Sequence, residues 1–466
     1  MSGTATRLSR SAGHGRPAAP VRIAHLGLGS FSRAHQAWYT DRAPDAAQWG
    51  IASFTGRSPD LARALRPQGG LYTLLVRQPD RDDVEVVSSL SQVHAATDHT
   101  AWLGVAAAAD TAVVTLTVTE AGYRRGPDGH LDIGRADVRD DVQALRADIG
   151  APVGTVPGRL VAGLAARRAA GSGPLTLLPC DNLPANGRVA ATVVDDLARA
   201  VDPALARWIR GTVLFGTTMV DRITPATTDD DRYAVLAAAG LHDAAPVPTE
   251  PFSEWVVAAD FPGGRPAWHE AGVTLVDDVA AFEERKLWLL NGAHSLLAYA
   301  GPLRGHTTVD EAMADPVVRG WVEQWWDEAA PRLSLSPAAV RDYRAALVAR
   351  FANPRIRHHL GQIAADGSQK LPVRLLPVVR AELAAGRLPD GALRVVAAWV
   401  AHLRGLGAPV ADDAAAPLAP AVQGDDDTAV RTVLAHLDTA LARDPAVVAR
   451  VRSHLSSLTG APVGAG

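Results

Sequence analysis

The sequence predicts an α/β N-terminal domain built on a doubly wound, mostly parallel sheet, followed by an all-α C-terminal domain. Three observations support this fold class. A strand, a glycine turn and a helix open the ordered chain, strand-like and helical segments then alternate, and the pattern becomes purely helical beyond about Gly272. The length of 466 residues suits two or three domains. We place a disordered leader at 1–20, the first domain at 21–275 and the second at 276–460.

The first half of the chain alternates between strand-like and helical segments. The segment 21–26 is short and largely apolar, and the helical stretch 34–41 follows the glycine turn. Later strand-like runs cover 50–54, 71–76, 84–88, 111–117 and 174–178. Helical patterns occupy 98–109, 136–147 and 158–170. Because strands that alternate with helices usually pair in parallel, we expect one doubly wound sheet.

The second half is expected to be helical throughout. From 279 to 299 one long helical pattern contains neither proline nor glycine except Gly292. Further helical segments are expected at 309–314, 318–328, 337–352, 372–385, 392–406 and 428–459, the last broken near Pro445. The segment 409–427 is rich in Pro, Ala and Asp and is expected to be a loop.

Composition excludes several function classes. With 47% hydrophobic and 21% charged residues the chain can bury a full-sized core, and a net charge of -4 leaves no basic surface for nucleic acid or an anionic membrane. The single cysteine, Cys180, excludes an internal disulfide and a cysteine-cluster metal site. No apolar run reaches the ~20 residues that span a bilayer, and 1–20 lacks the apolar core of a signal peptide. We therefore expect a cytoplasmic protein, a monomer or weak homo-oligomer, with neither nucleic-acid nor membrane partners.

Lysine is scarce in this chain. Lys286 and Lys370 are the only lysines among the 46 basic residues. Where arginine supplies nearly every positive charge, a lysine indicates a task that arginine cannot perform, and deprotonation near neutral pH is such a task.

The glycine turn is typical of a dinucleotide site. Gly27 and Gly29 follow a strand and precede a helix, an arrangement that lets the backbone approach a pyrophosphate. Ser32 stands where the third glycine of the usual fingerprint would be, so a simple tight turn is an equal alternative. Asp60 is the candidate for the ribose hydroxyls and favours NAD. Arg57 leaves NADP open, and the two side chains could also form a solvated pair.

The strongest chemical signal is a polar arc on the helical segment 282–295. Lys286 is taken as zero at the α-helical rotation of about 100° per residue. Glu283 then lies near ~60°, His294 near ~80° and Asn291 near ~140°, on an otherwise apolar helix. Such an arc is expected to face a polar cavity, although a solvated face with a Glu–Lys pair and a satisfied histidine is the alternative.

The residue types on this arc suit alcohol oxidation. A partly desolvated Lys286 can take a hydroxyl proton, which Glu283 can relay to solvent. Asn291 can donate to a developing alkoxide, and His294 can hold a neighbouring substrate hydroxyl.

Three further polar clusters are candidates for the site. Asn182 comes just after the predicted strand 174–178, at the end where such sheets bind ligands. Asp221 follows another apolar run, and Lys370 and Arg374 lie near a turn where they could meet a carboxylate or polyol hydroxyls. An Asx turn before a helix cap, a structural Asp–Arg pair and a basic helix start are equally good interpretations of the three clusters.

Taken together, these motifs resemble the mannitol dehydrogenase family of polyol-specific long-chain dehydrogenases. The resemblance runs in order from about residue 21 to about residue 405. It rests on 25–29 with Phe31, then 33–37, 117–123, 180–182, 186–187, 219–225, 250–252, 264–268, 286–299 and 366–372. As a set these motifs are highly specific, although no single one is.

The resemblance implies a Rossmann-type first domain, a helical second domain, an active site between them and no metal. The family's general base falls on Lys286, and its oxyanion-stabilising asparagines fall on Asn182 and Asn291. Its substrate-positioning histidine falls on His294, and a carboxylate associated with proton passage falls on Glu283. Further site positions of the family fall on Asp221 and Lys370, and Arg374, near the same turn as Lys370, is a further candidate for substrate binding. Cofactor contacts are expected from Gly27, Gly29, Phe31, Arg33, Asp60, Thr119 and Glu120.

One departure from the family concerns the substrate. Mannitol 2-dehydrogenases that resemble this chain carry Arg where Gln362 stands, and the segments 350–358 and 362–374 are more similar to the fructuronate reductase (D-mannonate oxidoreductase) branch. We expect NAD-dependent hydride transfer on a secondary alcohol or ketone of an acyclic polyol or sugar acid, of the mannitol/fructose or D-mannonate/D-fructuronate type. Mannitol-1-phosphate and pentitol dehydrogenases of the same family remain alternatives.

Two alternatives come from other classes of protein. A non-catalytic nucleotide-binding sensor would keep the fold, but the intact lysine, two asparagines and histidine argue against it. A zinc-dependent alcohol dehydrogenase is disfavoured by the lone cysteine and by the absence of a clear His/Glu ligand spacing.

Overall fold

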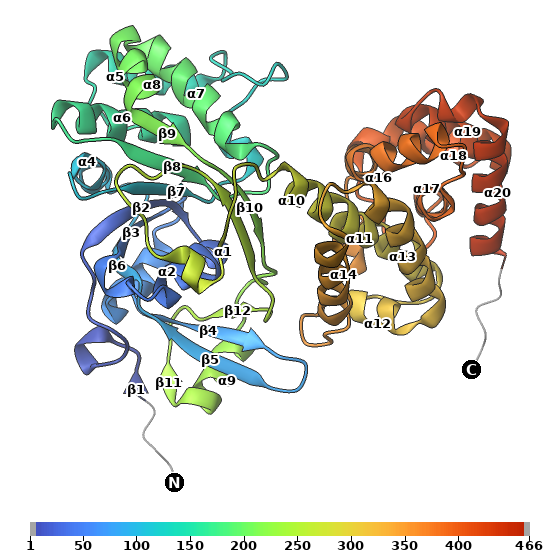
Figure 1. The fold of residues 1–466 in the computed structure, drawn as a ribbon, viewed down its shortest axis with the longest axis horizontal. Coiled ribbons are helices and arrows are strands. Elements are labelled where there is room, and N and C mark those ends of the chain that lie inside the picture. The colour runs from blue at the N-terminus through green and yellow to red at the C-terminus, as the bar shows by residue number, and fades with distance from the viewer. Residues whose placement is uncertain (1–5, 461–466) are drawn as a thin grey trace. The chain divides into compact units, whose positions relative to one another are not determined.

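The structure, a computed structural model, describes residues 6–460 (Figure 1). The chain divides into two compact units, Met1–Ala280 and Ala281–Gly466. Each unit has its own secondary structure and core, and each is described separately below.

The first unit is organised around a six-stranded sheet. Its strands are β2 (Val21–Leu28), β3 (Gly50–Thr55), β6 (Leu90–His94), β7 (Val113–Leu116), β8 (Leu175–Pro179) and β9 (Val213–Phe215). The strands lie in the order β6-β3-β2-β7-β8-β9, and every neighbouring pair is parallel. Numbered along the chain, this order is 3-2-1-4-5-6, the arrangement of doubly wound dinucleotide-binding sheets. The predicted fold class of this half is confirmed.

Alternate residues of the sheet strands face two separate cores. Leu26 and Phe54 pack with five helices on one face, while Ile23 and Ile51 belong to the core of the other face. The first face is covered by α4 (His99–Ala107), α5 (Ala136–Ala147), α6 (Val156–Ala169), α7 (Asn186–Val201) and α8 (Pro203–Thr212). The second is covered by α1 (Ser30–Ala34), α2 (Gln36–Arg42), α3 (Asp60–Leu65) and smaller sheets. Helices on both faces explain why the central strands are apolar on both sides.

Two predicted strands lie outside the main sheet. β4 (Tyr72–Arg77) and β5 (Asp82–Val87) pair antiparallel, and β12 (Val247–Thr249) adds to β4 in parallel. Only four residues join β4 to β5, which is too few for the crossover that parallel neighbours need. The expectation that the runs 71–76 and 84–88 join a single sheet is therefore wrong. β6, which was not predicted from the sequence, occupies the edge of the main sheet instead.

The remaining strands of the first unit form two small sheets. β10 (Thr217–Asp221) pairs antiparallel with β13 (Glu254–Ala258), which pairs with β14 (Thr274–Leu275). β1 (Thr6–Arg7) pairs with β11 (Leu241–His242), just after α9 (Asp229–Ala239).

The segment 6–20 is ordered, which corrects the prediction of a disordered leader over 1–20. Leu8 is fully buried, and the Arg10 guanidinium donates to the carbonyl oxygens of Gly69 at 2.8 Å and Ser88 at 3.0 Å. These contacts join residues 59 and 78 positions apart, so composition near the N-terminus gives no sign of them. Residues 1–5 lie outside the described part of the chain.

The second unit is built from helices, as predicted. They are α10 (Ala280–Arg285), η6 (Lys286–Gly292), α11 (Ala293–Leu303), α12 (Val309–Ala314), α13 (Pro316–Ala329), α14 (Pro337–Phe351), α15 (Leu360–Ile363), α16 (Gly367–Ala384), α17 (Asp390–Leu403), α18 (Ala419–Val422), α19 (Asp426–Leu437) and α20 (Pro445–Thr459). α17 forms the centre of the core, with Val396, Trp399 and Val400 at most 1% exposed. The predicted break near Pro445 is confirmed, because Asp444 caps α20 by accepting from the backbone N–H of Ala446 at 2.9 Å.

The predicted loop 409–427 contains short helical turns, so that expectation is partly wrong. A 3₁₀ segment covers Asp413–Leu418 and α18 follows it. Asp412 caps the 3₁₀ segment and also accepts from the backbone N–H and hydroxyl of Ser368, which ties the loop to α16.

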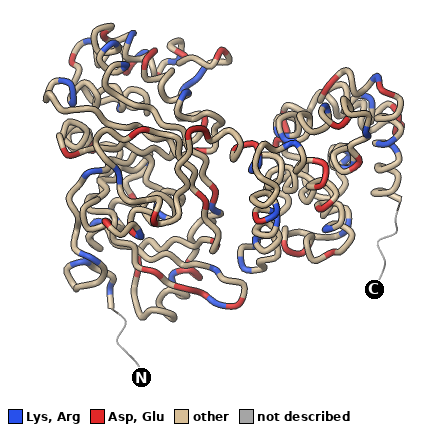
Figure 2. Tube along the Cα trace, viewed as in Figure 1, with Lys and Arg blue, Asp and Glu red and all other residues tan. Residues whose placement is uncertain are grey.

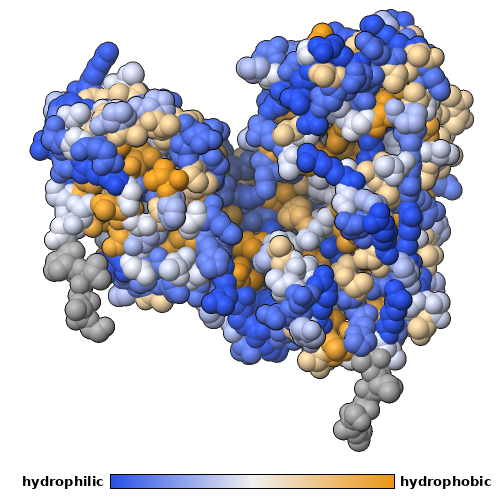
Figure 3. Space-filling model, turned by 180° about the vertical axis from the view of Figure 1, so that it is seen from behind, coloured by the Kyte–Doolittle hydropathy of each residue, from blue (hydrophilic) through white to orange (hydrophobic). Residues whose placement is uncertain are grey.

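The surface of both units is mixed in polarity. Charges of both signs are spread along the trace of each unit (Figure 2). On the face drawn in Figure 3, hydrophilic side chains surround small apolar patches. Within 6–460, no helix combines the length and the apolar character that crossing a membrane requires.

Candidate functional site

The glycine turn after β2 has the geometry of a close approach to a ligand. Gly27 has φ +99°, and a Cβ there would lie 2.1 Å from the carbonyl oxygen of Thr117. The Thr117 hydroxyl donates to the Gly27 carbonyl at 2.8 Å, which fixes the turn against β7. A Cβ on Gly29 would come no closer than 3.7 Å to another atom, so this stretch of backbone is not covered by the protein. The residues therefore fit a dinucleotide pyrophosphate.

This turn lies where the strand order of the sheet reverses. β3 and β6 extend from β2 in one direction, and β7, β8 and β9 extend in the other. Ligands of open parallel sheets bind outside the carboxyl ends of the strands at such a switch point. Thr119 and Glu120 follow β7 and are exposed at this same edge.

Ser32 and Arg33 support the turn from within the protein. The Ser32 hydroxyl accepts from the Gly29 N–H at 3.0 Å and donates to the Gly29 carbonyl at 3.2 Å. Arg33 is 3% exposed, and its Nε donates to the same carbonyl at 3.1 Å. Burial lowers the pKa of Arg33 to about 10. Phe31 is partly exposed and stacks on His35 with ring centroids 4.9 Å apart.

Two of the predicted cofactor residues carry exposed carboxylates. Asp60 begins α3, is 76% exposed at its side chain and pairs with Arg63 at 2.8 Å. Glu120 is 72% exposed and lies 3.5 Å from Arg125. Both pairs are on the surface and contribute little to stability, so these carboxylates remain available to a ribose.

The loop after β8 is held on two sides. The Asp181 carboxylate accepts from the Tyr123 hydroxyl and from the backbone N–H of Leu183 at 3.1 Å. Burial raises the pKa of Asp181. The Asn186 amide donates to the backbone oxygens of Asp181 at 3.2 Å and Thr218 at 3.0 Å. Asn182 is thereby presented on a fixed loop at a strand end, with its side chain exposed.

Asp221 ends β10 and is buried. Its neighbour Arg222 donates from Nη1 to the carbonyl of Ala34 at 2.6 Å and from Nη2 to the carbonyl of Glu250 at 3.1 Å. The guanidinium also lies 4.4 Å from the ring centroid of Trp38. Arg222, the residue after Asp221, therefore joins its own segment to the segments of Ala34 and Glu250, which are distant in the sequence.

The predicted catalytic segment is not a continuous α-helix. Residues Lys286–Gly292 form a π-helical segment between α10 and α11. The polar arc calculated at the α-helical rotation is therefore wrong in its angles. Hydrogen bonds from residue i+5 to residue i widen the turn, so the angle about the axis between Lys286 and Asn291 is smaller than the ~140° calculated for an α-helix. π segments within α-helices occur frequently at functional sites.

His294 occupies the first turn of α11 among other rings. It is 8% exposed, its ring centroid lies 5.0 Å from Phe351, and the His358 ring meets it edge-on at 5.2 Å. Burial and the neighbouring charges of His359 and Arg350 lower the pKa of His358. His358 was not among the predicted site residues. It lies 64 positions from His294, and no periodic pattern in the sequence links the two residues.

α16 brings the other two predicted cations to this region. Arg374 donates from Nη1 to the Asn291 carbonyl at 3.2 Å and to the Ser295 hydroxyl at 2.9 Å, and burial lowers its pKa to about 10. Lys370 donates to the carbonyl of Ala365 at 2.5 Å. Burial and the positive charge of Arg374 lower the pKa of Lys370. Within the second unit, Lys286, Asn291, His294 and Arg374 are thus assembled on one helix and its neighbour, with Glu283 at the end of α10.

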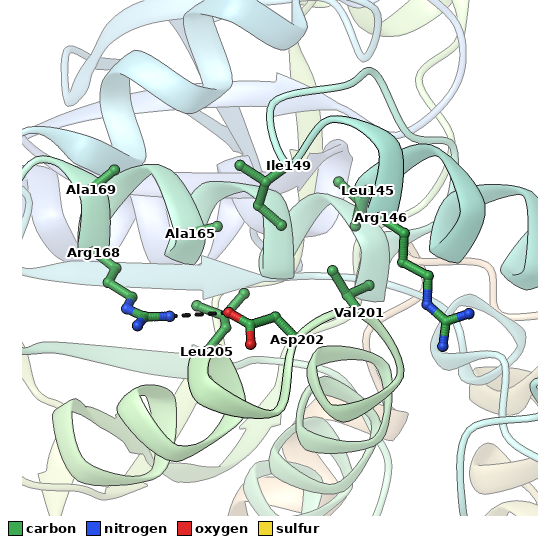
Figure 4. A pocket seen from close by; sticks show the side chains of 9 residues that line it. All are labelled: Leu145, Arg146, Ile149, Ala165, Arg168, Ala169, Val201, Asp202 and Leu205. Carbon is green, nitrogen blue, oxygen red and sulfur yellow. Dashed lines mark hydrogen bonds and ion pairs between the residues drawn. The ribbon is translucent and has the colours of Figure 1, made fainter.

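A surface cavity of about 440 Å³ lies elsewhere on the first unit (Figure 4). Its lining is mostly apolar and comes from α5, α6, α7 and α8: Leu145, Arg146, Ile149, Ala165, Arg168, Ala169, Val201, Asp202 and Leu205. Arg168 and Asp202 pair across it at 3.2 Å. No predicted site residue lines this cavity, so we assign it no part in the site.

Within 6–460, no three His, Cys, Asp or Glu side chains are grouped so that they could hold a metal ion.

Comparison with known families decides the identity of both units. The family model described as the mannitol dehydrogenase Rossmann domain matches residues 21–270, and the mannitol dehydrogenase C-terminal domain matches residues 278–459. The chain belongs to the mannitol dehydrogenase family. The family resemblance seen in the sequence is thereby confirmed, and the chain is an oxidoreductase of this family.

Individual relatives agree with this membership. An uncharacterised oxidoreductase of Escherichia coli (strain K12), YeiQ, is 40% identical over 83% of this chain and 79% of its own length. The D-mannonate oxidoreductase of the same organism is 38% identical over 83% of this chain and 80% of its own length. Among solved structures, the mannitol 2-dehydrogenase of Pseudomonas fluorescens, a ternary complex with NAD and D-mannitol, is 34% identical. It aligns with a TM-score of 0.77 over 97% of this chain and 94% of that one.

Proposed function

We propose that this member of the mannitol dehydrogenase family transfers a hydride reversibly between NAD and a secondary alcohol or ketone of an acyclic polyol or sugar acid. The observation that carries the proposal is the placement of Lys286 and Asn291 in one π turn, with His294 in the turn that follows. A base, an amide donor and a hydroxyl-orienting ring are the groups that this reaction needs.

The first unit would hold the cofactor, and nicotinamide would supply or accept the hydride. Gly29 leaves backbone open for the pyrophosphate beside the tight turn at Gly27, and Phe31, Thr119 and Glu120 follow the ends of the neighbouring strands β2 and β7. Arg33 is buried and would support the turn from within. Asp60 would accept from the ribose hydroxyls, which favours NAD. Arg57, exposed three residues earlier, keeps NADP as the alternative.

The second unit would supply the base. Lys286 takes the hydroxyl proton during oxidation and returns it during reduction, and Glu283, three residues earlier on α10, passes it to solvent. Asn291 donates to the oxyanion. His294 orients an adjacent substrate hydroxyl. The family resemblance assigns a second oxyanion donor to Asn182 and a further site position to Asp221, both of which belong to the first unit. No step in this scheme requires a metal.

Two variants at position 286 test whether Lys286 is the general base. Lys286→Ala removes the amine, and Lys286→Arg keeps a positive charge that cannot be lost near neutral pH. Both should lower kcat by at least about 100-fold, since general bases contribute about 10²–10⁴-fold, while the Kd of NADH stays the same. Near wild-type turnover in either variant would contradict the role of Lys286.

The substrate class is inferred from the charges near Asn291. Arg374 donates to the Asn291 carbonyl, and Lys370 lies one helical turn earlier on α16, so two cations lie near the end of the π segment. Paired cations favour a carboxylated substrate over a neutral polyol. We therefore expect oxidation of D-mannonate to be faster than oxidation of D-mannitol, and Lys370→Ala to lower kcat/KM for mannonate more than for mannitol. An equal effect on both would favour a neutral hexitol or pentitol.

The two alternative functions, a nucleotide-binding sensor and a zinc-dependent alcohol dehydrogenase, are tested in the same assays. A nucleotide-binding sensor would bind NADH but consume it with neither D-fructose nor D-fructuronate. A zinc-dependent enzyme would lose its activity after treatment with a chelator and regain it when zinc is restored.

A further inference from the structure

Three side chains from outside the helix donate to carbonyl oxygens of the π segment. The Trp325 indole N–H donates to the carbonyl of Trp288 at 2.9 Å, and the Trp326 indole N–H donates to that of Leu289 at 2.8 Å. Arg374 donates to the carbonyl of Asn291. Two adjacent residues of α13 therefore bind two consecutive carbonyls of the π segment, and both indoles are at most 1% exposed.

The packing of Trp325 against this segment is as specific as its hydrogen bond. A Cβ at Gly292 would lie 2.6 Å from the Trp325 Nε1, so the indole rests directly on the helix backbone. Gly292 is the last residue of the π segment. Glycine at this position lets the ring reach the carbonyl of Trp288.

Trp326 has a second connection to the predicted site. Its ring stacks on Phe351 with centroids 6.3 Å apart, and Phe351 packs against His294 at 5.0 Å. One tryptophan thus contacts the π backbone on one side and the ring that supports the histidine on the other.

The hydrogen bonds from Trp325 and Trp326 favour the π register of the segment over the α register. The π form is rare, and its hydrogen bonds run from residue i+5 instead of residue i+4. In the π form the carbonyls of Trp288 and Leu289 accept from the two buried indole N–H groups. A buried N–H group without an acceptor costs free energy, so these hydrogen bonds favour the π form. The angle about the axis between Lys286 and Asn291 is smaller in the π register than in the α register, so the register sets where the amide lies relative to the amine.

We propose that Trp325 and Trp326 are positioning residues, which hold Lys286–Gly292 in the π register and so fix the base relative to the oxyanion donor. The inference rests on the proposed function for its catalytic consequence. Its structural part, the register of the segment, stands independently of the substrate.

The test replaces the indoles by rings that lack the N–H. Trp325→Phe, Trp326→Phe and the double variant keep most of the ring volume but leave the carbonyls of Trp288 and Leu289 without these donors. Trp399→Phe is the matched control. Trp399 is fully buried in the same unit, and its indole N–H has no hydrogen-bond acceptor among the described residues.

Hydrogen–deuterium exchange measures how firmly the hydrogen bonds of the segment are held. Amides of the peptide 286–296 should exchange faster in the double variant than in the wild type, and at the wild-type rate in Trp399→Phe. Unchanged exchange in the double variant would overturn the inference. If the double variant does not fold, the two single variants decide by the same comparison.

Kinetics measures the catalytic consequence, with NADH and either D-fructuronate or D-fructose, well below the melting temperature. The double variant should lose about 10- to 100-fold in kcat, because a small misplacement of catalytic groups has effects of this size. KM and the Kd of NADH should stay within about twofold, which a general loss of structure would not allow. Wild-type kcat in the double variant, with Lys286→Ala inactive, would overturn the positioning role and leave the proposed function intact. Full activity of Lys286→Ala would instead contradict the proposed function.

Discussion

Ser32 and Gly29 form two reciprocal hydrogen bonds within the first turn after β2. The Ser32 hydroxyl accepts from the Gly29 N–H at 3.0 Å and donates to the Gly29 carbonyl at 3.2 Å. The usual dinucleotide fingerprint has a third glycine where Ser32 stands. The serine therefore closes the turn with its own side chain, and its departure from the fingerprint leaves the turn intact.

Replacing Ser32 by Ala should remove this closure. We expect the free energy of unfolding to fall by about 1 kcal/mol, the usual cost of a lost helix-capping hydroxyl. Chemical denaturation of the protein without cofactor measures the change. Ser30→Ala is the control on the same helix, since no hydrogen bond of the Ser30 hydroxyl is found within 6–460. An equal loss in both variants would show that the Ser32 bonds do not stabilise the turn.

Gly27 and Gly29 should respond differently to alanine. Gly27→Ala places a Cβ 2.1 Å from the Thr117 carbonyl at φ +99°, so the turn must distort, and we expect a loss of at least about 3 kcal/mol. Gly29 has φ -144° and room for a Cβ, so Gly29→Ala should change stability by less than about 1 kcal/mol. If the pyrophosphate approaches this backbone, Gly29→Ala should still weaken NADH binding by about tenfold. Thermal melting and a fluorescence titration with NADH separate the two effects, and unaltered NADH binding by Gly29→Ala would place the cofactor elsewhere.

The sequence predicted those features that local pattern determines. The helix at 136–147 has the predicted bounds, and the strand, glycine turn and helix at the start of the fold are present because turn chemistry and periodicity are local signals. The pairing of β4 with β12 was not predictable, because it joins residues more than 170 positions apart. Likewise, nothing near 6–20 indicates that Leu8 is buried.

The candidate site, too, could be predicted only where local sequence pattern determines it. Lys286, Asn291 and His294 could be grouped because one helix carries them, and the scarcity of lysine drew attention to it. Their angular relation was wrong because α and π segments share the same residue types, and the donors that accompany the π form lie 37 positions away. His358 and Arg374 approach this helix from other elements, so their contacts with His294 and Asn291 required the tertiary structure.

Glu328 should make stability depend on pH near neutrality. It accepts from the backbone N–H groups of Gly391 at 2.6 Å and Ala392 at 3.0 Å, and burial raises its pKa from 4.5 to about 7. Between these values the folded protein binds more protons than the unfolded chain, so this stability is present below pH 4.5 and is lost as the pH rises through 7. The loss is at most about 3 kcal/mol.

Glu328→Gln tests this linkage. The free energy of unfolding should differ less between pH 5 and pH 8 in the variant than in the wild type, as measured by chemical denaturation. Glu382→Gln is the control with the opposite sign. Hydrogen bonds from Arg387 and Arg332 lower the pKa of Glu382 to about 2, so its stabilisation is present above pH 4.5 and lost only in acid. That variant should lose similar stability at pH 5 and pH 8. An unchanged pH dependence in Glu328→Gln would show that Glu328 titrates normally.

In Gly292→Ala, helix propensity and side-chain packing are expected to have opposite effects on stability. Alanine is favoured over glycine by about 1 kcal/mol in a helix, so propensity alone predicts a more stable protein. A Cβ at this position lies 2.6 Å from the Trp325 Nε1, so the ring must move and its bond to the Trp288 carbonyl is strained. We expect a net loss of about 1–3 kcal/mol in the free energy of unfolding. Gly320→Ala is the control: Gly320 is exposed on α13 with no atom within 4 Å of a Cβ, so the change should stabilise by up to about 1 kcal/mol. A gain in both variants would mean that Trp325 does not rest on the helix backbone.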